Sequence, residues 1–236
     1  MSRAIPEPDP DLNGRVGIAI LARAPIPGAA KTRLIPALGS GGAASLQGWL
    51  LRRAVALAVV ADVGPVALWC AGDAGHPDFA ECRAYGPVAL HAQPAGDLGA
   101  RMLAAMRQSP TPGGTLVIGT DCPALTPSYL QQAAQALRDH EAVVIPAEDG
   151  GYVLIGMKAP APQIFAGIDW GGPQVMAQTR ERLATLGWHW LEPRTLWDVD
   201  RPEDLQRLYA ACPDARQASL LEATGCAART GAGGAS

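Results

Sequence analysis

The chain has 236 residues, of which 48% are hydrophobic and 17% charged, with a formal net charge of −3 and a pI near 5.8. This length fits one large domain, and the composition is that of a compact globular protein, which excludes a disordered or fibrous chain. The weak negative charge excludes a broad basic surface for a nucleic-acid backbone, although small anionic ligands remain open.

The two ends are expected to be flexible tails that flank a single domain. Residues 1–14 are rich in proline and acids, and residues 212–236 are poor in large apolar groups, so the domain should span 15–211.

The five cysteines are widely spaced and form no C-x-x-C pair, which indicates reduced thiols in a cytoplasmic protein. No signal peptide or membrane span is expected, since the apolar run VGIAILA is too short to cross a bilayer. We expect a monomer or homodimer without nucleic-acid or membrane partners.

Strand and helix patterns alternate along the expected domain. Short, continuous apolar runs predict buried strands at 16–22, 65–71, 88–93, 115–119 and 142–146. Helical patterns lie between them at 44–61, 97–108 and 127–140. This alternation predicts an α/β fold with a doubly wound, mostly parallel sheet. Because ligands bind such sheets at the carboxyl ends of the strands, the loops that follow strands are the ones to examine.

A basic loop, ARAPIPGAAKTRL, follows the first expected strand. Gly28 favours a tight turn, the prolines restrict the backbone, and Lys31 lies two residues from Arg33, so both cations can converge on one oxyanion. The loop has neither the Walker spacing nor the G-x-G-x-x-G spacing. It is therefore either a phosphate-binding loop of another type or a solvated basic loop ahead of a helix.

The stretch PAGDLGARM opens the helix expected at 97–108. Asp97 is well suited to cap this helix, and Arg101 is either a surface charge or a ligand contact.

Asp121 follows the strand expected at 115–119, in the stretch VIGTDCPAL. A carboxylate at a strand end can bind a hard divalent cation together with the oxygens of a diphosphate. Asp121 is therefore the first candidate metal ligand, and the alternative is an Asx-turn residue.

The stretch IPAEDGGYVLIG follows the last expected strand and predicts an acidic turn entering another strand, as in a hairpin. Glu148 or Asp149 could act as a base or ligate metal, while Gly150 and Gly151 would let a ligand approach the backbone. Turn chemistry alone also explains these four residues.

Farther along, LWDVDRPEDLQRL is expected to end a short strand near Asp198 and Asp200 and then to open a helix. Glu203 and Asp204 complement the helix dipole and need no catalytic explanation. Asp200 falls at a strand end, as Asp121 does, so the fold could bring both carboxylates to one cation.

Five motifs in this order, APIPGAAKTRL, GDLGARM, GTDCPAL, PAEDGGYVLIG and DVDRPEDL, resemble the bacterial DUF2064 family over roughly residues 16–210. That family, also known as radical SAM/selenodomain-associated transferases, includes proteins called arsenosugar-biosynthesis glycosyltransferases. It belongs to the nucleotide-diphospho-sugar transferase superfamily, whose GT-A fold is a Rossmann-like three-layer α/β/α sandwich. The KTRL and DxDxPEDL pieces are also similar to guanylyltransferases that activate phosphoglycolate-type acids.

The resemblance implies a role for each matching residue. Asp121 and Asp200 would hold Mg²⁺ or Mn²⁺ against a nucleotide diphosphate. Lys31 and one of the acids Glu148 and Asp149 would be catalytic. The implied nucleotide-binding residues are Arg23, Gly28, Lys31, Arg33, Asp97, Gly99, Arg101, Gly150 and Gly151. The chain departs from the family pattern at Gly171 and Gly172, where relatives tend to carry hydroxyl groups, and at Arg23, where lysine is common.

Three functions follow as hypotheses. The leading one is a Mg²⁺-dependent glycosyltransferase that moves a sugar from a nucleotide sugar to a small acceptor. The second is a nucleotidyltransferase that joins a nucleoside triphosphate to a phosphorylated or carboxylated small molecule and releases pyrophosphate. The third is a noncatalytic nucleotide-binding protein.

Overall fold

The computed structural model describes residues 14–225, so residues 1–13 and 226–236, which are the outer parts of the tails predicted at 1–14 and 212–236, lie outside it. In this part of the chain the strands are β1 (Gly17–Arg23), β2 (Val66–Ala71), β3 (Val88–Ala92), β4 (Thr115–Ile118), β5 (Ala142–Pro146), β6 (Tyr152–Met157) and β7 (Trp190–Leu191). The α-helices are α1 (Ile35–Ala61), α2 (Pro77–Glu81), α3 (Leu98–Gln108), α4 (Pro127–Asp139), α5 (Pro162–Phe165), α6 (Val175–Thr185), α7 (Asp204–Ala211) and α8 (Pro213–Gly225). Two 3-10 turns, η2 (Thr32–Leu34) and η3 (Cys82–Tyr85), complete these elements.

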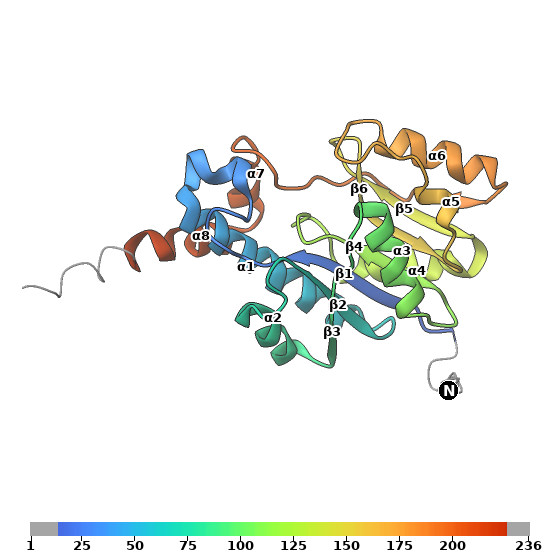
Figure 1. Cartoon of the computed structure of the whole chain (residues 1–236), viewed down its shortest axis with the longest axis horizontal. Helices are drawn as coiled ribbons and strands as arrows, with labels where there is room; N and C mark the ends of the chain where they lie inside the picture. The colour runs from blue at the N-terminus through green and yellow to red at the C-terminus, as the bar shows by residue number, and fades with distance from the viewer. Residues whose placement is uncertain (1–13, 226–236) are drawn as a thin grey trace, which may run out of the picture.

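The strands form one sheet in the order β3-β2-β1-β4-β6-β5-β7 (Figure 1). All neighbouring pairs are parallel except those of β6, which runs antiparallel to both β4 and β5. The predicted α/β fold with a mostly parallel sheet is confirmed. The reversed β6 is the strand expected after the acidic turn, and it brings that turn to the same end of the sheet as the carboxyl end of β4.

Helices cover both faces of the sheet, as the side-chain alternation of buried strands requires. Ile18 and Ile20 of β1 pack in a cluster with residues of α1 and α4, whereas Ala19 between them packs with residues of α3 and α6. The result is the three-layer α/β/α sandwich that the resemblance implied.

Helix α8 overturns the predicted tail boundary at residue 212, because residues 213–225 are helical. Figure 1 shows α7 and α8 against the first half of α1. Ala215 of α8 is fully buried, and a Cβ added at Gly42 of α1 would lie 2.8 Å from the carbonyl oxygen of Ser219. Small residues therefore let the two helices approach closely, so the scarcity of large apolar groups was a misleading sign of a tail.

The helical stretch Thr32–Ala61 is long and apolar enough to cross a membrane by length and composition alone. In the structure 61% of its apolar window is buried inside the protein, as in the core helix of a globular fold. Leu46 and Leu50 face Trp197 and Leu208 in a third apolar cluster, so this helix is part of the core.

Candidate active site

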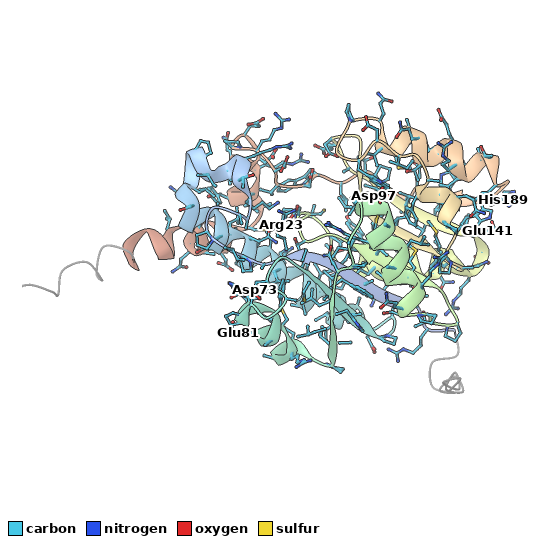
Figure 2. All side chains as sticks on the ribbon, viewed as in Figure 1. Arg23, Asp73, Glu81, Asp97, Glu141 and His189 are labelled. Atoms are coloured by element: carbon cyan, nitrogen blue, oxygen red, sulfur yellow. The ribbon has the colours of Figure 1, made fainter. Side chains whose placement is uncertain are left out.

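A cavity of about 570 Å³ opens where the carboxyl ends of β1 and β4 meet the amino end of β6. This is the end of the sheet at which α/β proteins bind ligands. Figure 2 shows Arg23, the last residue of β1, well separated from Glu141 and His189, which lie toward the other end of the strands. The predicted site residues that line the cavity are Arg23, Lys31, Arg33, Arg101, Asp121 and Asp200.

Lys31 and Asp121 form an ion pair in this cavity, with Nζ 2.8 Å from Oδ1. The same ammonium donates a hydrogen bond of 2.6 Å to the carbonyl oxygen of Val199. The Lys31 side chain is only 4% exposed, whereas that of Asp121 is 49% exposed. The resemblance implied that Lys31 faces a nucleotide's phosphates; in the structure its ammonium faces Asp121, the predicted metal ligand.

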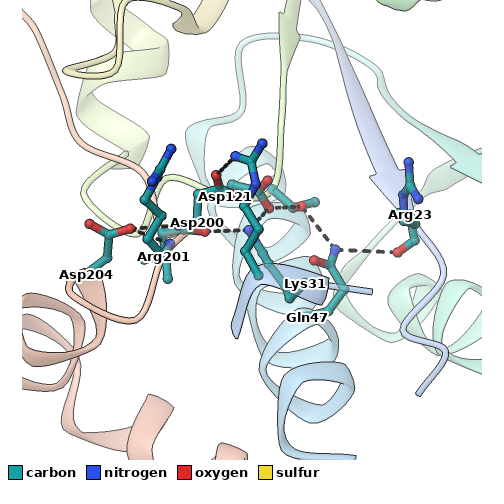
Figure 3. A network of polar contacts seen from close by, with 10 residues as sticks. Arg23, Lys31, Gln47, Asp121, Asp200, Arg201 and Asp204 are labelled. Carbon is teal, nitrogen blue, oxygen red and sulfur yellow. Dashed lines mark hydrogen bonds and ion pairs between the residues drawn. The ribbon is translucent and has the colours of Figure 1, made fainter. Parts of the chain in front are cut away.

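Two polar residues that sequence reasoning missed hold Asp121 in place (Figure 3). The buried Gln47 of α1 donates to Thr120 Oγ1 at 3.2 Å and to the Arg23 carbonyl oxygen at 3.4 Å. Thr120 in turn donates to Asp121 Oδ1 at 3.0 Å. Gln47 belongs to no recognisable sequence motif. The one available signal was a glutamine within an apolar helix, since a buried side-chain amide requires a polar partner.

Asp121 and Asp200 line one cavity because a backbone hydrogen bond links the two segments that carry them. The Val199 amide donates to the Asp121 carbonyl oxygen at 2.8 Å. Arg33 pairs with the Asp200 carboxylate, and Asp204 accepts from the Asp200 and Arg201 amides at 2.9 and 2.7 Å. The predicted meeting of the two aspartates is confirmed, while their metal binding stays a prediction.

The strand predicted near Asp198 is wrong. Among the described residues this segment forms only an isolated parallel bridge between Leu196 and Ala147, and it continues as an irregular chain to α7. The segment therefore lies beside the carboxyl ends of β4 and β5 and does not form a further strand of the sheet.

A second cavity of about 350 Å³ adjoins the first, and Arg33 and Asp200 line both. Asp149 and Asp198 line the second one. Burial, reinforced by the negative charges of Asp149 and Asp121, raises the pKa of Asp198 to about 6. The sequence reasoning named Asp198 but gave it no role at the site, although the D-x-D spacing of an extended chain places the side chains of Asp198 and Asp200 on one face.

The structure distinguishes the two candidate bases. Both carboxylate oxygens of Glu148 accept hydrogen bonds from Arg207, at 2.7 and 3.0 Å, and these bonds lower the pKa of Glu148. Asp149 accepts only a local bond from the Gly151 amide at 2.9 Å among the described contacts. Because a carboxylate paired with arginine is a poor proton acceptor, Asp149 is the better candidate.

Several predicted nucleotide-binding residues have structural roles and do not line the main cavity. Asp97 caps α3 by accepting from the Ala100 amide at 2.8 Å, and Gly99 packs against Trp170. Gly150 has φ +93°, and a Cβ there would lie 2.1 Å from the Pro173 carbonyl oxygen, so protein backbone fills its open side. Gly28, with φ +82°, precedes the cavity residue Ala29, and Gly151 precedes the cavity residue Tyr152.

Arg101 extends into the cavity from the first turn of α3. Its Nε atom is shielded from solvent and has no hydrogen-bond partner among the described residues. Tyr152, whose pKa is raised by burial, lies on the β6 side and contacts Met102 Sδ through its hydroxyl at 3.8 Å. A guanidinium beside an apolar wall suits a ligand with an anionic group and an apolar or planar part.

No group of three or more His, Cys, Asp or Glu side chains among residues 14–225 is arranged to hold a metal ion.

The family whose description reads "Uncharacterized protein conserved in bacteria (DUF2064)" matches residues 54–172, about half of the chain. This chain belongs to the DUF2064 family. The matched residues include Asp97, Arg101, Asp121 and Asp149, whereas Lys31 and Asp200 lie outside the matched part. No protein with a curated functional description matches the sequence.

Solved structures share the fold of this DUF2064 chain. A protein from Desulfovibrio desulfuricans G20, provisionally described as a nucleotide-diphospho-sugar transferase, has 27% identity and a TM-score of 0.77 over 88% of this chain and 97% of that one. A cytidylyltransferase from Leptospira borgpetersenii has 12% identity and a TM-score of 0.57 over 94% and 99% of the two chains. A CMP:2-keto-3-deoxy-manno-octonic acid synthetase complexed with CTP has 12% identity and a TM-score of 0.51 over 85% and 99%. The chain therefore has the fold of nucleotide-diphospho-sugar transferases and nucleotidyltransferases.

Proposed function

We propose that this protein is a Mg²⁺- or Mn²⁺-dependent glycosyltransferase that binds a nucleotide sugar and passes the sugar to a small acceptor in the cytoplasm. The observation that carries the proposal is the joint lining of one cavity by two carboxylates, Asp121 and Asp200, and by the cations of the basic loop. Such a site can hold a diphosphate between fixed positive charges. The similarity to the structure from D. desulfuricans supports the same class of donor.

Asp121 and Asp200 would hold the divalent cation, and the local chemistry fits one. Their oxygens are the hard ligands that Mg²⁺ prefers, and the ion pair of Asp121 with the Lys31 ammonium at 2.8 Å supports a site that favours positive charge. When bound, the metal would supply charge stabilisation for the departing diphosphate.

The protein's own cations would bind and orient the donor. Arg23 lies at the end of β1, and Arg101 reaches the cavity from α3 with an Nε atom that has no hydrogen-bond partner within residues 14–225. Both can donate paired hydrogen bonds to phosphate oxygens, which positions the bond to be broken.

The acceptor would enter through the second cavity, which shares Arg33 and Asp200 with the first. There Asp149 would accept the proton of the attacking hydroxyl group, because its carboxylate is free of arginine partners among the described residues.

Nucleotidyl transfer is the second candidate, and the fold shared with cytidylyltransferases favours it. The same cavity would then hold a nucleoside triphosphate, and an anionic acceptor would attack the α-phosphorus.

The released product distinguishes the two reactions when the protein is incubated with donors, acceptors and Mg²⁺. A nucleoside diphosphate indicates glycosyl transfer, pyrophosphate indicates nucleotidyl transfer, and nucleotide binding without either product indicates a noncatalytic protein.

The Asp121→Asn variant tests the site itself. We expect it to lose Mg²⁺-dependent nucleotide binding in calorimetry while it stays folded, because asparagine keeps a hydrogen-bond acceptor for Lys31 but not the charge that binds metal. The control is Glu81→Gln on α2, an exposed carboxylate away from the cavity, which should bind as the wild type does (Figure 2). Unchanged binding by Asp121→Asn would remove Asp121 from the site.

A further inference from the structure

Lys31 is held in an unusual way for a lysine in a binding loop. Its backbone is left-handed, with φ 48°, and its side chain is almost completely buried. A lysine on a solvated loop would keep its ammonium in water, since this strongly hydrated charge is costly to bury. The burial is compensated by the two contacts to Asp121 Oδ1 and the Val199 carbonyl oxygen.

These two contacts put the ammonium between the segments that carry the two predicted metal ligands (Figure 3). Asp121 is bound through its side chain, and the Val199 carbonyl directly precedes Asp200. The oxygen that Lys31 contacts, Oδ1, also accepts a hydrogen bond from Thr120, so the ammonium and the hydroxyl bind the same carboxylate oxygen.

Arg33 does not share this arrangement. Its side chain is 63% exposed and pairs with a 42% exposed Asp200 carboxylate, so solvent screens that pair. Lys31 is therefore the buried cation that pairs directly with Asp121.

We propose that Lys31 is a tethered counter-ion, which holds the cation position at Asp121 in the ligand-free protein and is displaced when a divalent cation binds there. This inference rests on the metal role proposed above for Asp121. A divalent ion and the ammonium compete for the same oxygen and repel each other. The flexible four-carbon stem then lets the released ammonium turn to the phosphates of a nucleotide in the same cavity. Metal and nucleotide binding are thus coupled through one side chain.

Binding of Mn²⁺ alone, followed by electron paramagnetic resonance, tests this competition. In Lys31→Met and Lys31→Gln the competing charge is gone, so we expect Mn²⁺ to bind at least about fivefold more tightly than to the wild type, the lower end of usual coupling between sites. Lys31→Arg keeps the charge and should keep the weaker affinity. The matched control is Lys158→Met, which removes the only other lysine, an exposed residue bonded to the Arg138 carbonyl oxygen.

A second measurement adds a nucleoside diphosphate, using UDP and GDP in separate titrations. The nucleotide should strengthen Mn²⁺ binding to the wild type more than to Lys31→Met or Lys31→Gln, because only the wild type gives the displaced ammonium a new partner. Lys31→Gln retains a donor for the Val199 carbonyl, so it decides the test if Lys31→Met does not fold.

Two results would overturn the inference in different ways. If folded Lys31→Gln binds Mn²⁺ no more tightly than the wild type, and the wild type binds Mn²⁺ with nucleotide, the counter-ion role is wrong while the proposed function stands. If neither the wild type nor any variant binds Mn²⁺ with or without nucleotide, the proposed metal-dependent function fails as well.

Discussion

Thr120 joins two polar side chains at the end of β4, and its position shows how a single hydroxyl orders the candidate site. It accepts from the buried Gln47 and donates to Asp121, so its loss affects both neighbours. The adjacent aspartate could be read from the sequence because it follows an apolar strand. The hydroxyl and the amide could not, since their contact joins β4 to α1 across 73 residues of sequence.

Replacing Thr120 by valine keeps the shape of the side chain and removes the hydroxyl. We expect the free energy of unfolding in urea to fall by about 1–3 kcal/mol, the usual cost of leaving a buried polar group unsatisfied. Thr185→Val removes an exposed hydroxyl that donates to the Glu181 carbonyl, and it should change stability by less than about 0.5 kcal/mol. Equal effects in both variants would show that Gln47 finds another partner.

Backbone hydrogen bonds close the hairpin between β5 and β6. The Ala147 amide donates to the Gly151 carbonyl at 3.0 Å, and the Gly150 amide donates to the Ala147 carbonyl at 3.2 Å. The acidic pair followed by two glycines predicted this turn. The close approach of Pro173 to Gly150 was not predictable, because it depends on how the segment before α6 folds back on the turn.

Gly150→Ala should destabilise the protein more than Gly171→Ala. Both glycines have a left-handed φ, of +93° and +86°, which costs a non-glycine residue about 1–2 kcal/mol. Gly171 has no atom within 4 Å of an added Cβ, whereas Gly150 meets the Pro173 carbonyl oxygen at 2.1 Å. The difference between the unfolding free energies of the two variants measures the contact with Pro173. Similar values would mean that the segment around Pro173 moves away freely.

At the scale of the whole molecule, three buried thiols are distributed through the core. Burial raises the pKa of Cys70 and Cys82 to about 11 and that of Cys122 to about 12. An unfolded thiol releases its proton near pH 8.5, so between that pH and about 11–12 the folded chain binds more protons than the unfolded one.

Stability should therefore fall as the pH rises through this window, under reducing conditions. Cys122→Ala removes one of the shifted groups, and its unfolding free energy should decline less steeply with pH than that of the wild type in urea titrations. Parallel curves for the two proteins would show that Cys122 is not protected from ionisation in the fold.

The sequence was most informative where one short segment decides the outcome. The apolar runs predicted β1 to β5, and Thr126 and Pro127 begin α4 as their helix-start pattern indicates. The order of the strands depends on pairings between distant segments, such as β1 with both β2 and β4, and no local pattern encodes these. The same limit applies to the site, because the pairing of Lys31 with Asp121 is a contact between loops ninety residues apart.

The reversed direction of β6 also bears on how relatives of this chain can diverge. A hairpin turn can be lengthened or exchanged without changing the pairing of the parallel strands beside it. That turn carries Asp149 and borders the second cavity, which we propose as the acceptor site, so we expect mutation there to alter the choice of acceptor and leave the donor side intact. One inherited sheet can in this way serve chemically different pathways by remodelling a few residues at its rim.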